Sequence, residues 1–180
     1  AREINWYKKL QSMDYKSIPT IYSFSPLKMK YIEGKNIYDY SYLPCNQKRE
    51  ILAEIINKLD SMHSLETAAY DEASYRDTYL NKTYKRLEKV QELVPFADDK
   101  TVIINGKECR NIFYYKGEVE KLVMQYAPAS FSLIHGDCTF SNIMLKNDSE
   151  PIFIDPRGYF GKTELFGDAA YDWVKLYYSL

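Results

Sequence analysis

The sequence predicts an α+β fold in which helices dominate and a few short antiparallel hairpins lie between them. Most segments place apolar residues three or four positions apart, which is the spacing of one helix face. Short extended segments, by contrast, are separated by turn residues such as Ser25-Pro26 and Asn105-Gly106. The chain shows no repeats, low-complexity tracts or evident linkers. A mostly helical chain with a few hairpins is typical of the α+β class.

The predicted helices follow from apolar spacing and from residues that cap or end a helix. The first is short and amphipathic, and the clearest has a continuous apolar stripe that includes Ile56. A later helix is expected to stop near Pro95, and the last one begins at the N-cap residue Asp168. The predicted helices cover residues 2–13, 46–66, about 74–94, 118–127 and 168–180.

The predicted strands pair as hairpins around turn residues. The first pair ends at Gly34, and Asn105-Gly106 is the type of dipeptide that closes a tight hairpin. The last pair is joined by "NDSE", a polar turn at 147–150. The paired segments are 18–24 with 27–32, two strands within 101–112, and 143–146 with 151–154.

Composition and charge exclude several classes of protein. The chain is 46% hydrophobic and 27% charged, and its net charge of -1 gives no general reason to expect a nucleic-acid partner. It lacks an apolar run of membrane-spanning length and a signal-peptide pattern, so no membrane partner is expected. Cys45, Cys109 and Cys138 lie far apart without a CxxC pair, which argues against a disulfide framework or zinc ribbon. These features predict a cytoplasmic protein.

The segment from His135 to Gly158, "HGDCTFSNIMLKNDSEPIFIDPRG", contains the strongest functional pattern. Pairing 143–146 with 151–154 predicts that Asn142 lies directly opposite Asp155, with Asp137 in the preceding loop. Two carboxylates and an amide oxygen that converge in this way suit Mg²⁺, which prefers oxygen ligands. The alternative for each single residue is that Asp137 and Asn142 only cap turns.

These residues resemble a known family. "HGDCTFSN" followed by "FIDPRG" resembles the catalytic loop and metal-binding Asp of the aminoglycoside phosphotransferase/choline kinase family, whose members are relatives of protein kinases. Further similar segments are "EINWYKKL", "LKMKYIEGKNI", "INKLDSMHSL" and "GDAAYDWVKL". The resemblance implies a protein-kinase-like fold. Residues 1–34 would be a remnant of the β-rich N-terminal lobe, with a helix, two strands and the hinge, and residues 35–180 an incomplete, mostly helical C-terminal lobe with the catalytic loop.

The resemblance also implies how the motif residues divide the chemistry. Asp137 would orient the acceptor hydroxyl and take its proton, while Asn142 and Asp155 would hold Mg²⁺ on the phosphates of ATP. Phosphoryl transfer needs mainly positioning and neutralisation of phosphate charge, which such a set supplies.

Other residues would have supporting roles under the same resemblance. Glu3 would pair with a phosphate-binding Lys that this chain does not contain, and the backbone of Lys30, Tyr31 and Ile32 would form the hinge that holds adenine. His135 would support the catalytic loop rather than react, and Asp172 would brace that loop through backbone hydrogen bonds.

The chain departs from the kinase pattern at several points. No GxGxxG motif is present, so we expect a fragment of a longer kinase that alone binds ATP weakly and turns over poorly. Arg157, in Asp-Pro-Arg-Gly, would contact a phosphate of the nucleotide or acceptor, or else form a salt bridge. Cys138 is expected to pack rather than act as a nucleophile, because only His135 is near it in sequence.

The sequence therefore predicts an ATP- and Mg²⁺-dependent phosphotransferase that acts on a hydroxyl of a small molecule. That molecule would be a sugar, a sugar derivative, choline or an aminoglycoside-like compound. "DPRG" and "GDAAYDWVKL" resemble, more narrowly, phosphotransferase-like proteins associated with bacterial surface and capsular polysaccharide synthesis, which favours a sugar. The alternative is a non-catalytic, kinase-like binding module. A two-metal phosphatase is disfavoured because the chain has only His63 and His135.

Overall fold

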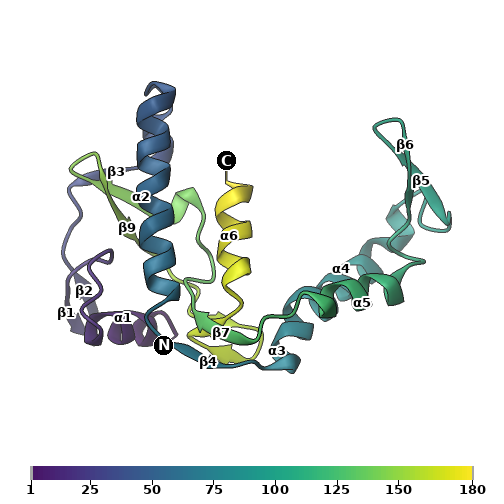
Figure 1. Ribbon diagram of the computed structural model, residues 1–180, viewed down its shortest axis with the longest axis horizontal. Coiled ribbons are helices and arrows are strands. Elements are labelled where there is room, and N and C mark those ends of the chain that lie inside the picture. The colour runs from purple at the N-terminus through teal and green to yellow at the C-terminus, as the bar shows by residue number, and fades with distance from the viewer. Residues whose placement is uncertain (1, 180) are drawn as a thin grey trace.

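The computed structural model describes residues 2–179, which form an elongated molecule of helices and antiparallel strands (Figure 1). The chain is 44% helical and 22% strand, which agrees with the predicted α+β class. One half contains α1 (Arg2–Ser12), α2 (Cys45–His63) and α6 (Ala169–Tyr178). The other half extends to the right in Figure 1 and contains α3 (Glu72–Arg76), α4 (Lys82–Val90) and α5 (Lys116–Gln125). Within residues 2–179, no helix is both long and apolar enough to cross a membrane.

The strands form small antiparallel sheets rather than one large sheet. In one sheet, β7 lies between β12 and β4, and in another, β8 lies between β3 and β9. The remaining strands form the isolated pairs β1–β2, β5–β6 and β10–β11. The strands are β1 (Ile21–Phe24), β2 (Leu27–Met29), β3 (Gly34–Asn36), β4 (Thr67–Ala69), β5 (Thr101–Ile104), β6 (Lys107–Arg110), β7 (Ser130–Leu133), β8 (Ile143–Lys146), β9 (Glu150–Phe153), β10 (Tyr159–Phe160), β11 (Thr163–Glu164) and β12 (Phe166–Gly167).

The predicted helices are confirmed, with two differences in detail. α2 ends at His63 rather than at residue 66, because the chain turns there and forms the short strand β4. Ile56 is 41% exposed, although the sequence pattern placed it in the apolar stripe. Ile55 and Leu59 are fully buried and lie one helical turn apart, so the buried face is narrower than predicted and Ile56 lies on its flank.

The helical segment predicted at 74–94 is present but not regular. Between α3 and α4 the chain forms a π-helical turn, η2 (Asp77–Asn81), in which the Lys82 N–H donates to the carbonyl oxygen of Asp77. A 3₁₀ turn, η3 (Gln91–Leu93), completes the segment before Pro95. Hydrogen bonds between residues five positions apart are rare in proteins, and such π turns occur frequently at functional sites.

The predicted hairpins are confirmed, but the register of the last one differs from the prediction. Asn105 and Gly106 join β5 to β6 with positive φ angles of 52° and 77°, as a tight hairpin turn requires. In the β8–β9 hairpin, Ile143 pairs with Phe153, so Asn142 lies opposite Ile154 and not opposite Asp155. The Ile154 N–H donates to the Asn142 carbonyl oxygen at 3.0 Å. The prediction was wrong by one residue because β9 begins at Glu150 and shortens the turn.

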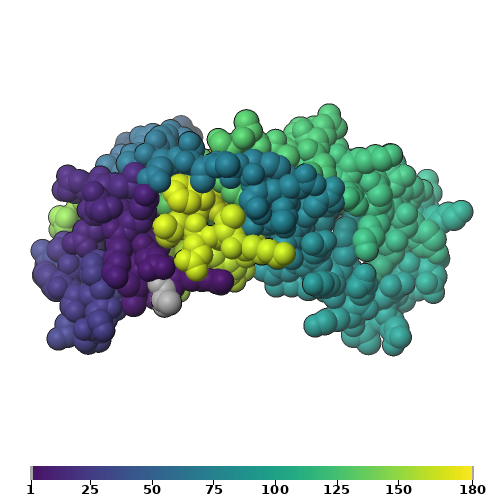
Figure 2. Space-filling view, turned by 90° about the horizontal axis from the view of Figure 1, so that it is seen from below, coloured from purple at the N-terminus to yellow at the C-terminus, as the bar shows by residue number. Residues whose placement is uncertain are grey.

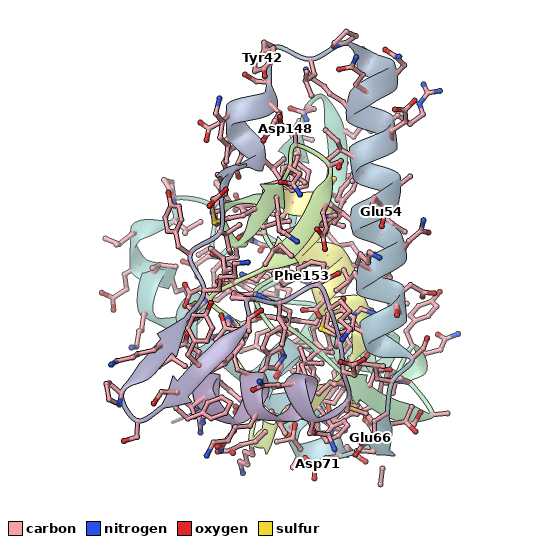
Figure 3. The ribbon with its side chains drawn as sticks, turned by 90° about the vertical axis from the view of Figure 1, so that its left-hand side faces the viewer. Tyr42, Glu54, Glu66, Asp71, Asp148 and Phe153 are labelled. Carbon is pink, nitrogen blue, oxygen red and sulfur yellow. The ribbon has the colours of Figure 1, made fainter. Side chains whose placement is uncertain are left out.

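The main apolar core joins α1 to the β8–β9 hairpin, to β7 and to α2. Its fully buried side chains include Trp6, Tyr7 and Phe153, and the view in Figure 3 shows Phe153 in the middle of this half. Asp148 marks the turn at the far end of the same hairpin. Packing on α1 therefore fixes the end of the hairpin that carries Asn142 and Asp155.

Candidate active site

The loop that follows β7 is held by one buried carboxylate. The Asp172 side chain, in the first turn of α6, is completely buried. Its Oδ2 accepts a hydrogen bond from the His135 N–H and its Oδ1 accepts one from the Gly136 N–H, both at 2.8 Å. Hydrogen bonds from backbone N–H groups to a carboxylate are short and strong. Asp172 therefore fixes the backbone immediately before Asp137, where Gly136 has a φ of 80°.

The His135 ring is fixed in one neutral form. Its Nε2 lies 2.9 Å from the Ile154 carbonyl oxygen, and its Nδ1 lies 3.2 Å from the Asp137 backbone nitrogen. A carbonyl oxygen can only accept and a backbone N–H can only donate, so the ring carries its proton on Nε2. Burial lowers the pKa of His135, although the nearby Asp172 carboxylate opposes this shift. His135 thus connects the loop that carries Asp137 to the strand end before Asp155.

Asp137 and Asn142 are in direct contact. The Asn142 Nδ2 donates to the Asp137 carbonyl oxygen at 2.9 Å, and a longer contact of 3.4 Å joins it to Asp137 Oδ2. The Asp137 side chain is 41% exposed, and its Oδ1 lies 2.9 Å from the Lys175 Nζ. Lys175 follows Asp172 on α6 by one turn, so α6 supplies both a brace for the loop and a cation for its carboxylate. The carboxylate is thereby held at the surface, where a substrate can reach it.

Asp155 stands at the end of β9 in a left-handed conformation, with a φ of 53°. Its backbone N–H donates to the Tyr7 hydroxyl at 3.2 Å, while its side chain is exposed and forms no ion pair among residues 2–179. Burial raises the pKa of Tyr7, and the Glu3 and Asp155 carboxylates add to this shift. Tyr7 therefore stays neutral and can orient the Asp155 backbone.

The donor set at this end of the hairpin fits a hard cation. Asn142 uses its amide nitrogen on Asp137, which leaves its Oδ1 without a hydrogen bond from the described residues. In the described part of the chain, no three His, Cys, Asp or Glu side chains form a ready metal cluster. A cation here would therefore take oxygens from Asn142 and Asp155 and complete its shell with waters or phosphate oxygens, as Mg²⁺ usually does.

Arg157 contacts tyrosines rather than a carboxylate. Its two terminal nitrogens donate to the hydroxyls of Tyr171 and Tyr159, at 2.9 Å and 2.8 Å. No carboxylate lies within salt-bridge distance of it among residues 2–179. The salt-bridge interpretation is therefore wrong for this residue in this structure. The hydrogen bond from Arg157 lowers the pKa of Tyr159.

Cys138 is a fully buried core residue. Its side chain has no exposed surface and belongs to the same apolar cluster as Trp6 and Phe153. Burial raises the pKa of the Cys138 thiol, and the charges of Asp172 and Asp137 add to the effect. A protonated, inaccessible thiol is a poor nucleophile. This placement agrees with the packing role expected for Cys138.

The predicted hinge residues line a small cavity on the other side of the hairpin. Lys30, Tyr31 and Ile32 follow β2 and, together with residues from 16–20 and Ile152, surround about 190 Å³. The Lys30 N–H already donates to the Thr20 carbonyl oxygen at 2.8 Å. The Lys30 N–H is therefore already used, whereas the N–H groups of Tyr31 and Ile32 form no hydrogen bond with the described residues.

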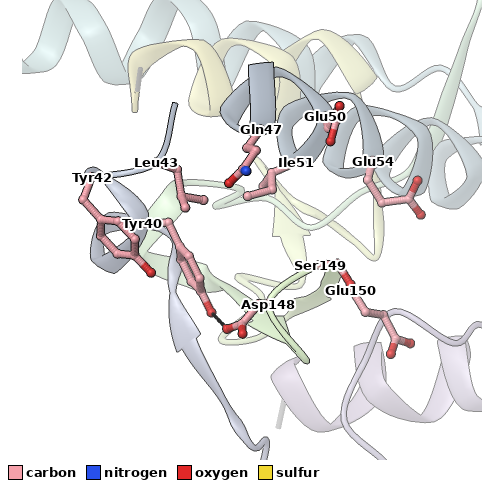
Figure 4. Close-up of a pocket in the computed structure, with 10 residues that line it drawn as sticks. All are labelled: Tyr40, Tyr42, Leu43, Gln47, Glu50, Ile51, Glu54, Asp148, Ser149 and Glu150. Atoms are coloured by element: carbon pink, nitrogen blue, oxygen red, sulfur yellow. Dashed lines mark hydrogen bonds between the residues drawn. The ribbon is translucent and has the colours of Figure 1, made fainter. Parts of the chain in front are cut away.

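A larger cavity, of about 590 Å³, does not lie at the predicted site. It is lined by Tyr40, Glu54 and Asp148 among others, and Asp148 accepts a hydrogen bond from the Tyr40 hydroxyl at 2.6 Å (Figure 4). Asp148 is in the turn of the β8–β9 hairpin, whereas Asn142 and Asp155 are at its open end. A four-residue strand is roughly 13 Å long, so the two places are separate.

Comparison with models of protein families identifies the family of this chain. The model of the phosphotransferase enzyme family, APH, matches residues 14–179, which is nearly the whole chain. The chain belongs to this phosphotransferase family. No curated protein matches the sequence.

The phosphotransferase match includes every predicted site residue except Glu3. The match begins at residue 14, so α1 lies outside it. Glu3 forms no ion pair among the described residues, so its predicted pairing with a Lys stays a prediction. The match supports a kinase-like enzyme in general, as the motif in residues 135–158 indicated.

Several residues of the candidate site were not found from the sequence. Local sequence patterns do not mark these residues as part of a site. The fold brings Tyr7 to Asp155, Lys175 to Asp137 and Lys82 to Arg157. For Lys175 a signal did exist, because it lies one helical turn after Asp172 on a helix that the sequence predicted. For Tyr7 and Lys82 no local pattern indicates the contact.

Proposed function

We propose that this phosphotransferase moves the γ-phosphoryl group of Mg²⁺-bound ATP to a hydroxyl group of a small molecule. The observation that carries the proposal is the Asp137–Asn142 contact next to Asp155, on a loop fixed by Asp172. Asp137 is exposed enough to meet a substrate, and Asn142 and Asp155 offer free oxygens for a cation. This is the division of roles that phosphoryl transfer requires.

In the proposed reaction, the acceptor hydroxyl donates a hydrogen bond to the Asp137 carboxylate. The hydroxyl oxygen forms a bond to the γ-phosphorus, the bond between that phosphorus and the β–γ bridging oxygen breaks, and the hydroxyl proton passes to Asp137. Lys175, at 2.9 Å from Asp137 Oδ1, holds the carboxylate in position. Mg²⁺ held by Asn142 and Asp155 would neutralise phosphate charge. Tyr31 and Ile32 would contact the adenine base through their backbone.

A sugar or sugar derivative is the acceptor that we favour. Support comes from the resemblance of Asp-Pro-Arg-Gly and "GDAAYDWVKL" to phosphotransferase-like proteins of bacterial surface polysaccharide synthesis. Choline and aminoglycoside-like compounds are the other acceptors that the family resemblance suggests. A cytoplasmic location is proposed because ATP is available there.

The test is a turnover assay on the intact protein with Mg-ATP and a panel of sugars, sugar acids, choline and aminoglycosides. Asp137→Ala is expected to reduce turnover by at least ~10³-fold, the scale of losing a positioned proton acceptor, while it keeps nucleotide binding. Cys138→Ala and the exposed Asp60→Ala are matched controls that should retain turnover. Unchanged turnover in Asp137→Ala would overturn the assignment. Nucleotide binding without turnover on any acceptor would favour the non-catalytic binding module instead.

A further inference from the structure

A third cavity, of about 180 Å³, is lined by Arg157, whose side chain packs against Gly136 next to Asp137, and no role described above uses this cavity. One wall is the π turn and the start of α4, with Asp77, Thr78 and Lys82. The other wall is formed by Arg157, Tyr159 and Tyr171, from the segment after Asp155 and from α6. Figure 2 shows that the C-terminal part of the chain, in yellow, adjoins the segment around residues 70–85, in blue-green.

The charged groups on this cavity are mostly positive. Lys82 forms no ion pair among residues 2–179, and Arg157 donates only to tyrosine hydroxyls. Burial lowers the pKa of Lys82, and the positive charges of Arg157, Arg86 and Lys175 add to this shift, whereas Tyr159 opposes it. Asp77 is the one carboxylate on the lining. Two cations and one carboxylate leave the lining with a net positive charge, so a bound anion would stabilise it.

Thr78 and Lys82 lie four positions apart and share this wall, and the π turn adds Asp77 to it. In an α-helix, residues three and four positions apart share a face, and residues five apart do not. Here the hydrogen bond from the Lys82 N–H to the Asp77 carbonyl oxygen brings residues five apart into line. Between them, the Thr78 hydroxyl is buried and has no hydrogen-bond partner among the described residues. An unpartnered buried hydroxyl is costly, and a staggered rotation of the Thr78 side chain would turn it to a ligand in the cavity.

The cavity is coupled to Asp137 by short connections. The Arg157 N–H donates to the His135 carbonyl oxygen at 3.0 Å, and the Arg157 side chain packs against Gly136 so closely that a Cβ there would lie 3.0 Å from the Arg157 Cβ. Lys175 contacts Asp137 at 2.9 Å and lies 5.9 Å from the centre of the Tyr171 ring. A molecule with its hydroxyl at Asp137 can therefore extend another group into the cavity.

We propose that this cavity binds an anionic group, a phosphate or a carboxylate, on the acceptor whose hydroxyl faces Asp137. The inference rests on the proposed function and narrows its substrate class to acidic or phosphorylated hydroxy compounds. Arg157 and Lys82 would donate to the anion, and the Thr78 hydroxyl would add a third donor. Cationic acceptors such as choline and aminoglycosides are disfavoured, because the same groups repel them.

The direct test measures binding of inorganic phosphate to the intact protein by calorimetry, without nucleotide and at fixed ionic strength. Lys82→Ala is expected to weaken phosphate binding at least ~10-fold, as loss of a charged hydrogen bond does. Thr78→Val keeps the side-chain shape and should weaken phosphate binding several-fold. Lys85→Ala removes an exposed lysine from the same helix and should change it by less than ~2-fold. Equal effects of Lys82→Ala and Lys85→Ala would overturn the site.

A second arm separates the acceptor from the nucleotide. Phosphate binding is repeated with saturating Mg²⁺ and a non-hydrolysable ATP analogue, and we expect phosphate to bind alongside the analogue. If the analogue displaces phosphate, the cavity holds a nucleotide phosphate and the acceptor assignment is wrong. If phosphate binds through Lys82 but no acceptor is ever phosphorylated, the anion site stands and the proposed function fails. If glycerol is phosphorylated as well as glycerate, the function stands and the anion site fails.

Discussion

The buried carboxylate of Asp172 lies 3.0 Å from the Nε2 of His63, although the two residues are 109 positions apart. The same carboxylate receives the backbone N–H groups of His135 and Gly136. Three donors therefore converge on one side chain, and they come from α2 and the loop that carries Asp137. Asp172 joins α2 and α6 to the loop that carries Asp137.

Asp172→Asn is expected to lower the free energy of unfolding by roughly 3–5 kcal/mol, because it places an amide N–H₂ against backbone donors in the interior. Chemical denaturation followed by circular dichroism measures the change. Asp60→Asn, on the exposed side of α2, is the control and should change it by less than about 0.5 kcal/mol. A similar small change for both variants would show that Asp172 does not organise the loop.

The stability of the protein should fall as the pH drops below about 6.5, the usual pKa of histidine. Below that pH the His135 side chain takes up a proton more readily in the unfolded chain than in the folded protein, and this favours unfolding. Burial lowers the pKa of His135 in the folded state. The contribution of neutral His135 to the free energy of unfolding is therefore complete above that pH and is lost below it. The free energy of unfolding of wild type minus that of His135→Gln should decline by up to about 1.4 kcal/mol per pH unit. A difference that stays constant from pH 8 to pH 5 would contradict this.

Tyr7→Phe should raise the Mg²⁺ concentration that gives half-maximal turnover several-fold. The variant removes the oxygen that accepts the Asp155 N–H, and Asp155 then loses one constraint on its orientation. Loss of one such hydrogen bond costs about 1 kcal/mol, which corresponds to roughly a fivefold change in an equilibrium constant. A Mg²⁺ titration of turnover measures it. Tyr22→Phe, at a 67% exposed position, should leave the titration unchanged. An equal shift in both variants would contradict a role of Tyr7 in orienting Asp155.

The three cysteines should differ in reactivity toward a thiol reagent in the native state. Cys45 is exposed and should react first, Cys109 is partly buried and should follow, and Cys138 should react only on unfolding. Burial raises the pKa of the Cys138 thiol, which leaves little thiolate at neutral pH. The measurement is a count of modified thiols over time, with and without denaturant. Rapid native-state modification of Cys138 would show that the core around it opens easily.

The sequence indicated most of the elements and the core of the site, because both depend on local patterns. Apolar spacing located α2 and α6, and Asn105-Gly106 located a hairpin. The spacing of Asp137, Asn142 and Asp155 pointed to the phosphotransferase family that the comparison shows, while the roles of these residues stay predictions. The register of β8 and β9 was wrong by one residue because the length of a polar turn is not fixed by its composition.

The contacts that were not predicted are those between distant segments. Tyr7 meets Asp155 across 148 positions, and Arg157 finds tyrosines where a carboxylate was one of two expectations. The π turn before Lys82 has no sequence signature of the kind that caps or breaks a helix. Such contacts depend on tertiary packing, which local sequence patterns do not reveal.

The packing of α1 has a consequence during synthesis. Trp6 donates to the Ile134 carbonyl oxygen and Tyr7 accepts from Asp155, so the partners of α1 are translated 128 and 148 residues later. At about 5–20 residues per second, the apolar face of α1 waits for roughly 7–30 seconds on the ribosome before it can be covered. α1 is thus translated well before the residues that hold it in place. In that interval the nascent chain presents Trp6, Tyr7 and Leu10 as a surface for chaperones.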